Sequence, residues 1–190
     1  MFSAVLDTSV LWPSTQRDFL LSLAAESLYR PLWSSAILEE LRYTHVRKLV
    51  QRSVTPAKAE SQSAHLVEQM RAAFDDAEVS HWEPYDGTFG LPDPAGEHVL
   101  AAAVAGGAGA IVTENLKDFP SARIPLGIQI RPARDFAADT VAVNPRRGLR
   151  AVATMSARRQ FPPESVDDLL LVLRERYGMD EAVDLIEEAR

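Results

Sequence analysis

Residues 2–11 read FSAVLDTSVL, an apolar run that ends at Asp7 and is followed by small polar residues. A short apolar run that stops at a polar residue predicts a buried strand, here over residues 2–6. Three further stretches predict strands, at residues 77–83, 110–113 and 127–131.

Helical patterns separate these expected strands. Apolar residues recur at helical spacing over residues 17–29, and Ser34 and Ser35 are good caps for a helix that follows them. Thr55-Pro56 predicts the start of another helix of about 18 residues. A fourth helix is expected over residues 98–105, with Asp93 as a cap. Strands that alternate with helices predict an α/β fold with a mostly parallel sheet.

The amino-acid composition excludes several classes of function. The chain has 190 residues, of which 46% are hydrophobic and 25% charged, as in ordinary globular domains. It contains no cysteine, which excludes a disulfide scaffold, a thiolate zinc site and a cysteine nucleophile. A net charge of −7 argues against a protein that coats nucleic acid by neutralising phosphates. It is compatible with a nuclease, whose metal-binding carboxylates themselves add negative charge.

The composition changes near residue 140, where an arginine-rich stretch without acids begins over residues 141–160, followed by an acidic stretch over residues 161–190. This change predicts a domain over residues 1–137 and a helical C-terminal extension over residues 138–190. The longest apolar stretch, residues 99–112, is shorter than the roughly 20 residues that a membrane-spanning helix needs. The start of the chain has no basic region before its apolar run. We therefore expect a cytoplasmic protein with no membrane partner.

The polar residues at the ends of the strands suggest the chemistry. In open parallel sheets, ligands bind beyond the carboxyl ends of the strands. Asp7 follows the first expected strand, and Asp118 lies one turn beyond the third. Glu40 lies on a helix that could face the same edge, and Asp93 opens another helix. Converging carboxylates favour a hard cation such as Mg²⁺ or Mn²⁺, which activates water and stabilises charge on a phosphoryl group.

Four motifs, in order, resemble those of PIN-domain proteins, including the toxin ribonucleases of VapBC toxin–antitoxin pairs. The resemblance covers roughly residues 3–136 and implies a three-layer α/β/α sandwich. It also implies an endoribonuclease that hydrolyses RNA with Mg²⁺ or Mn²⁺, a cognate antitoxin protein and often a homodimer. The motifs are LDTSVL at 6–11, SSAILEEL at 34–41, LPDPAGEHVLAAA at 91–103 and IVTENLKDFP at 111–120.

The resemblance assigns roles to individual residues. Asp7 matches the acid after the first strand, Glu40 the helix glutamate and Asp118 the last acid. Glu39 is the alternative to Glu40. Asn115 matches a polar position after the third strand. Two further residues match small polar positions near the metal, namely Ser9 and Thr113.

The chain departs from the family pattern at the start of the helix over residues 98–105. Related sequences carry an extra acid where this chain has Ala95 and Gly96. Asp93, three residues before Gly96, shares its helical face, whereas Glu97 is about 100° away from it. Either could replace the missing acid as a metal ligand.

Two other functions remain open at this point. A catalytically weakened or inactive PIN domain would act as a module that binds RNA or protein. A phosphotransfer enzyme with Asp7 as nucleophile is disfavoured, because Ser9 stands where such phosphatases carry a second aspartate. His98 is interpreted as a structural residue. Two basic stretches could contact the RNA backbone or pair within the chain, one on the Glu40 helix and one around residues 146–150.

Overall fold

A computed structural model describes the whole chain, residues 1–190. The chain divides into two compact units, which we describe separately. The sheet unit comprises Phe2–Trp12 and Pro31–Ile130. The helical unit comprises Met1, Pro13–Arg30 and Arg131–Arg190. The predicted boundary at residue 137 is not tested by this division and stays a prediction.

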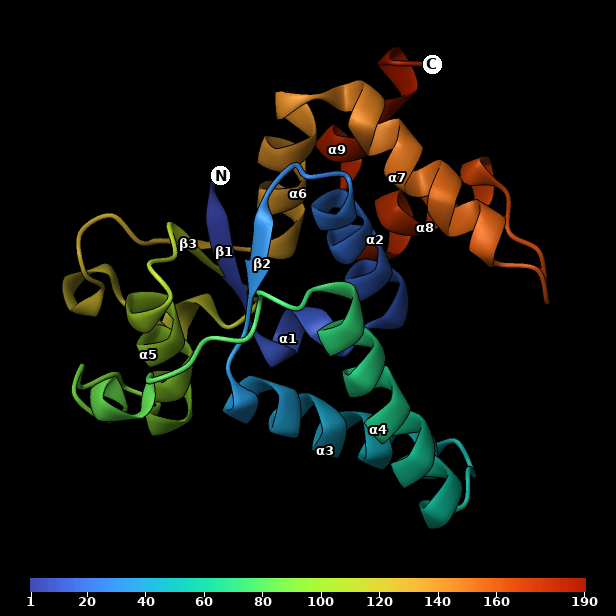
Figure 1. Cartoon of the computed structure of the whole chain (residues 1–190). Helices are drawn as coiled ribbons and strands as arrows, with labels where there is room; N and C mark the ends of the chain where they lie inside the picture. The colour runs from blue at the N-terminus through green and yellow to red at the C-terminus, as the bar shows by residue number, and fades with distance from the viewer. The chain divides into compact units, whose positions relative to one another are not determined.

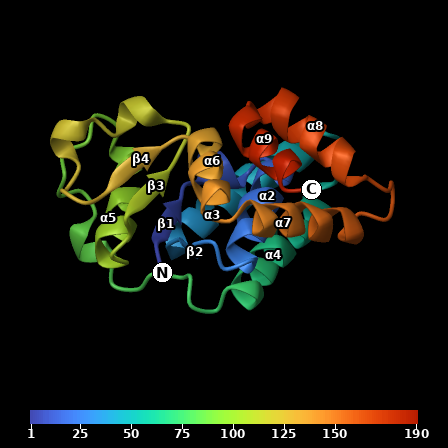
Figure 2. The same ribbon diagram turned by 90° about the horizontal axis from the view of Figure 1, so that it is seen from above.

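The sheet unit is built around four parallel strands in the order β2-β1-β3-β4, which Figure 2 shows from above. The central pair, β1 (Ser3–Leu6) and β3 (Ala110–Val112), is fully or almost fully buried apart from its first residue, Ser3. Its register pairs Leu6 with Val112. The outer strands are β2 (Arg30–Leu32) and β4 (Gln129–Arg131). Short apolar strands paired in this way place the residues that follow β1 and β3 next to one another.

Four helices belong to the sheet unit (Figure 1). α1 (Thr8–Leu11) follows β1 directly, and α5 (Glu97–Ala105) precedes β3. α3 (Ser35–Gln51) begins at the predicted cap, where the Ser34 hydroxyl accepts a hydrogen bond from the Ile37 N–H at 3.2 Å. α4 (Pro56–Ala73) begins with proline, as predicted, and packs against α3. Four 3₁₀ turns complete the unit: η1 (Glu83–Tyr85), η2 (Pro94–Gly96), η3 (Leu116–Asp118) and η4 (Ser121–Arg123).

One predicted strand is wrong. Residues 77–83 contribute a single bridge, between Glu78 and Trp33, and the strand beside β1 is β2 instead. The pairing stops because His81 adopts a left-handed conformation with φ of 61°, which turns the chain away from the sheet into η1. An isolated His in this conformation is tolerated more easily than most residues.

The helical unit contains α2 (Ser14–Ala25) and the four helices of the C-terminal part of the chain. α2 packs against α7, and α6 packs against α9. Tyr29 and Phe136 meet edge to face, with ring centroids 4.8 Å apart. The predicted helical nature of the C-terminal extension is confirmed. Its helices are α6 (Ala133–Val143), α7 (Pro145–Arg158), α8 (Val166–Tyr177) and α9 (Asp180–Glu188).

The arginines of α7 pair within the chain. Arg150 forms an ion pair with Glu26 at 2.8 Å, and Arg158 one with Asp18 at 2.7 Å. Both acids belong to the α2 segment, so the partners come from the N-terminal part of the chain and not from the acidic last helices. These partly exposed ion pairs connect α7 to the α2 segment and are individually weak.

The strands and helices confirm the predicted α/β class with a parallel central sheet. No helix combines the length and the apolar character that crossing a membrane requires.

Candidate active site

Asp7 is the centre of a hydrogen-bonded cluster where β1 ends. Its side chain is 6% exposed, and Oδ2 accepts hydrogen bonds from the Ser9 hydroxyl and the Thr113 hydroxyl, each at 2.7 Å. The Asp7 N–H donates to the Val112 carbonyl at 3.0 Å, which continues the β1–β3 pairing by one residue. The two hydroxyls fix the carboxylate, and no cationic side chain pairs with it.

The same two hydroxyls orient the segment that follows β3. The Glu114 N–H donates to Ser9 Oγ, and the Asn115 N–H donates to Thr113 Oγ1, both at 3.0 Å. Ser9 and Thr113 are therefore bound to Asp7 on one side and to backbone amides on the other. The predicted polar positions Ser9 and Thr113 thus lie together with Asp7, while the Asn115 side chain is exposed.

Glu40 lies beside this cluster, connected to it through the residue after Asp7. The Thr8 hydroxyl donates to Glu40 Oε2 at 3.1 Å, and His98 Nε2 lies 3.5 Å from the same oxygen. The packing of α1 and α5 against α3 brings these three side chains together. The hydrogen bond from His98 lowers the pKa of Glu40, and the Thr8 hydrogen bond acts in the same direction. The Glu40 side chain is 49% exposed, so an ionised carboxylate faces the solvent here.

The start of α5 supplies two candidate acids with different surroundings. Asp93 caps η2, where its Oδ1 accepts a hydrogen bond from the Ala95 N–H at 2.9 Å. Its charge is close enough to Glu40 to oppose the ionisation of that residue. Glu97, by contrast, is 5% exposed and accepts hydrogen bonds from the Phe89 N–H at 3.0 Å and the Leu91 N–H at 2.6 Å. Its carboxylate holds a loop in place.

Gly96 stands where the family pattern has an acid, and its surroundings are apolar. A Cβ at this position would lie 3.2 Å from the Phe119 ring and 3.4 Å from the Leu91 side chain. A side chain here would point into apolar packing, so this position is suited to glycine.

Asp118 is not hydrogen-bonded to the cluster. It is the last residue of η3 and half-buried, and its side chain makes no hydrogen bond or ion pair with Asp7 or Glu40. The structure thus brings Asp7, Ser9, Thr113 and Glu40 into one cluster and places Asp93 within electrostatic reach of Glu40. It does not bring Asp118 into contact with them.

The donor chemistry of the cluster suits a hard divalent cation. The Asp7 carboxylate is buried without a counter-cation, and its side-chain partners are hydroxyl oxygens, while Glu40 has the Thr8 hydroxyl and the His98 imidazole beside it. No group of three or more histidine or acidic side chains lies at metal-holding distances in the structure. The residues therefore suit a divalent cation in chemistry, and hydrogen bonds to neighbouring side chains orient the carboxylates of Asp7 and Glu40.

Sequence reasoning missed two residues of this cluster. Thr8 was visible only as a polar residue after Asp7, and its link to Glu40 depends on the packing of α1 on α3. The sequence interpretation of His98 as a structural residue does not include its contact with the Glu40 carboxylate. A histidine one residue after the start of α5 gives no sequence signal for this contact, because the partner is 58 positions away in the chain.

One basic stretch lies on the same helix as Glu40. Lys48 lies over the Trp12 ring, 4.8 Å from its centroid, and Arg42 is 3.9 Å from Glu60 in an exposed pair. Exposed pairs of this kind are weak. The helix that carries Glu40, α3, therefore also carries the positively charged side chains of Arg42 and Lys48.

Comparison with known proteins adds one finding. A family model described as PIN domain matches residues 3–117, which is more than half of the chain and includes Asp7, Glu40 and Thr113. No curated protein and no solved structure matches the chain.

Proposed function

The chain belongs to the PIN-domain family, and from this membership we propose that it is a metal-dependent endoribonuclease that hydrolyses RNA phosphodiester bonds. PIN domains are in general nucleases that use divalent metal ions. The observation that carries the proposal for this chain is the buried Asp7 carboxylate, fixed by two hydroxyls and without a counter-cation, beside the ionised Glu40.

We propose that Asp7, Glu40, Asp93 and Asp118 hold Mg²⁺ or Mn²⁺. Asp93 is preferred to Glu97 as the acid at the start of α5, because the Glu97 carboxylate is already bound to two backbone amides. A bound divalent cation would supply an activated water and would stabilise the charge that develops on phosphorus.

The residues of the chain have their own parts in this proposal. Ser9 and Thr113 keep the Asp7 carboxylate in one orientation through their hydrogen bonds. Thr8 and His98 do the same for Glu40 and favour its charged form. We assign to the exposed Asn115 a contact with the scissile phosphate.

We further propose that the protein is the toxin of a toxin–antitoxin pair, with a cognate antitoxin protein as partner, a homodimeric assembly and a cytoplasmic location. The support for this finer assignment is the order of the four motifs, LDTSVL, SSAILEEL, LPDPAGEHVLAAA and IVTENLKDFP, of which the first three lie within the matched region and the fourth extends three residues beyond it.

The test is cleavage of mixed tRNA and rRNA by purified protein with Mg²⁺, with Mn²⁺ and with a chelator. We expect metal-dependent cleavage that falls by about 100-fold or more in Asp7→Asn, since this change removes the central carboxylate charge. Asp75→Asn, an exposed acid outside the cluster, is the matched control and should cleave like the parent.

A folded protein that cleaves no RNA with either metal would contradict the enzymatic proposal. In that case a PIN domain that only binds RNA or protein becomes the better description.

A further inference from the structure

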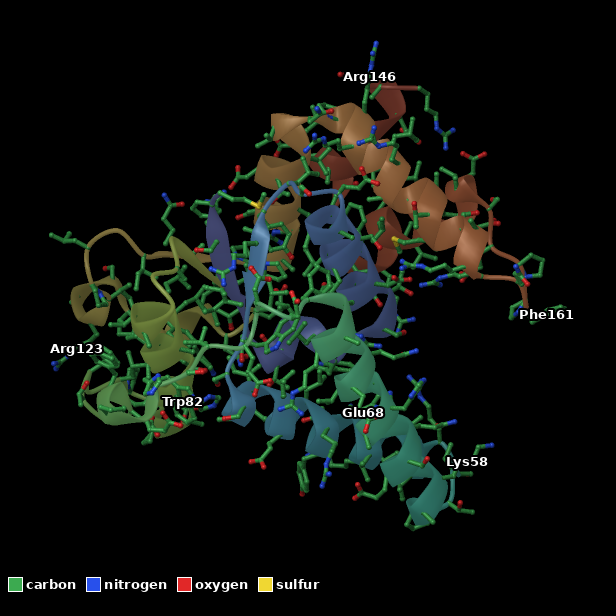
Figure 3. The ribbon with its side chains drawn as sticks, viewed as in Figure 1. Lys58, Glu68, Trp82, Arg123, Arg146 and Phe161 are labelled. Carbon is green, nitrogen blue, oxygen red and sulfur yellow. The ribbon has the colours of Figure 1, made fainter.

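A cavity of about 510 Å³ opens next to the candidate active site, within the sheet unit. It is lined by the first residue of α3, Ser35, and by the segment from Glu78 to Glu83, which includes Trp82. Pockets of this volume are in the range of those that bind small organic groups. Figure 3 shows Trp82 between α5 and the start of α3.

Trp82 connects this cavity to the acidic cluster. Its ring lies edge-on to His98, with ring centroids 6.4 Å apart and an angle of 64° between the planes. His98 in turn lies 3.5 Å from Glu40. One side chain therefore separates the indole from a proposed metal-binding acid, and the half-buried Trp82 itself lines the cavity.

The charges around the cavity indicate which part of a nucleotide would enter it. Glu78 is paired with Arg71 through two hydrogen bonds, at 2.7 Å and 3.0 Å. Glu83 is exposed and adds a negative charge to the lining. Because Arg71 balances the Glu78 charge, Glu83 is the lining acid that disfavours a phosphate, whereas a neutral base could use its N–H groups as donors to carboxylate and hydroxyl oxygens.

We propose that this cavity is a nucleobase-binding subsite in which a base of the substrate stacks on Trp82. The inference rests on the proposed function, because RNA is the ligand that brings a base to this place. Aromatic side chains bind unpaired bases through their faces, and a base held inside a duplex cannot reach such a face. The nucleotide that enters the subsite is therefore unpaired.

The experiment measures binding without cleavage. A fluorescent single-stranded RNA of about 12 nucleotides is titrated with protein in the presence of a chelator, and anisotropy gives Kd. Trp82→Leu keeps apolar volume but removes the flat ring, and we expect it to weaken binding about tenfold. Trp82→Phe keeps a ring, and binding should stay within about threefold of the parent. Circular dichroism confirms that each variant is folded.

The matched control is Tyr43→Leu. Tyr43 is 69% exposed on α3 and does not line the cavity, so this variant should bind RNA like the parent. A duplex of the same sequence should bind the parent protein more weakly than the single strand, and Trp82→Leu should change duplex binding little.

Three results would overturn the subsite. These are unchanged single-strand binding in Trp82→Leu, an equal loss in Tyr43→Leu, and no RNA binding by the parent protein. Failure of the proposed function looks different. RNA binding that depends on Trp82, in a protein that never cleaves RNA with metal, would refute the nuclease activity and leave the subsite in place.

Discussion

Glu40 receives hydrogen bonds from two elements that are distant in the sequence, through Thr8 of α1 and His98 of α5. We predict that Glu40→Gln lowers RNA cleavage about 100-fold and weakens Mn²⁺ binding measured by calorimetry, because it removes one of the two best-placed acids. Glu39→Gln is the matched control. Glu39 lines a separate cavity between α3 and α4, and its replacement should leave both quantities unchanged. Equal losses in the two variants would argue against Glu40 as the ligand.

The lowered pKa of Glu40 also predicts that the stability of the folded protein depends on pH. Its pKa in the folded protein is lowered from 4.5, chiefly by the hydrogen bond from His98. Its ionised form therefore stabilises the fold above that ordinary value, and this contribution is lost as the pH falls through the lower pKa of the folded state. Urea unfolding should show the parent more stable than Glu40→Gln at about pH 7, and this advantage should become smaller at about pH 3. If the difference in the free energy of unfolding between the parent and Glu40→Gln were the same at both pH values, ionised Glu40 would not be the cause of the pH dependence.

The surroundings of Gly96 predict how much stability the fold loses when an acid is introduced at this position. Its Cβ direction leads to Phe119 and Leu91, so Gly96→Asp would bring a carboxylate into apolar surroundings. We expect a loss of about 2 kcal/mol or more in the free energy of unfolding, against about 1 kcal/mol or less for Gly96→Ala. Chemical denaturation of both variants measures this. If Gly96→Asp kept its stability and bound Mn²⁺ more tightly, the missing acid would belong at position 96 after all.

Individual residues of the site differ in how well the sequence predicts them. Asp7 and Glu40 follow from motifs at a strand end and on a helix, and both lie in the cluster. The roles of Thr8, His98 and Trp82 depend on contacts between α1, α3, α5 and η1, which the spacing of residues along the chain does not contain.

The conformation of the loop that precedes α5 is stabilised by the Glu97 carboxylate. Glu97 binds the Phe89 and Leu91 amides, so Glu97→Gln should lower the free energy of unfolding by about 1.5–3 kcal/mol. Hydrogen exchange should become faster at these two amides. Mn²⁺ affinity should stay within about twofold of the parent, since the carboxylate is not available to the metal. A large fall in affinity with unchanged exchange would instead make Glu97 a ligand.

Helices and caps were predicted more accurately than strands. Ser34 and the Thr55-Pro56 start mark the beginnings of α3 and α4 through local chemistry. The strand expected over residues 77–83 was wrong, because pairing depends on a distant partner and is interrupted by the left-handed His81. β2 was missed because three residues carry no periodic signal.

For the whole molecule, the position of α2 decides how the chain can be divided. α2 buries Phe19, Leu20 and Leu23 and packs on α7 within the helical unit. A chain that ends at residue 137 would expose this surface, so we predict that it fails to unfold cooperatively or aggregates, whereas the full chain shows a single transition. Urea unfolding monitored by fluorescence and circular dichroism tests this. A truncated chain with an unchanged unfolding midpoint would instead establish residues 1–137 as an independent domain.

The direct contact between Asp7 and Thr113 joins residues 106 positions apart in the chain. During synthesis Asp7 is therefore made early, whereas Thr113, whose hydroxyl orients the Asp7 carboxylate, is made only after more than half of the polypeptide. Until then strand β1 lacks the neighbour that pairs with it, and contacts of such separation form slowly. A site that needs both strands therefore stays incomplete until the second half of the sheet has emerged and folded, so the proposed ribonuclease activity would begin only after that point.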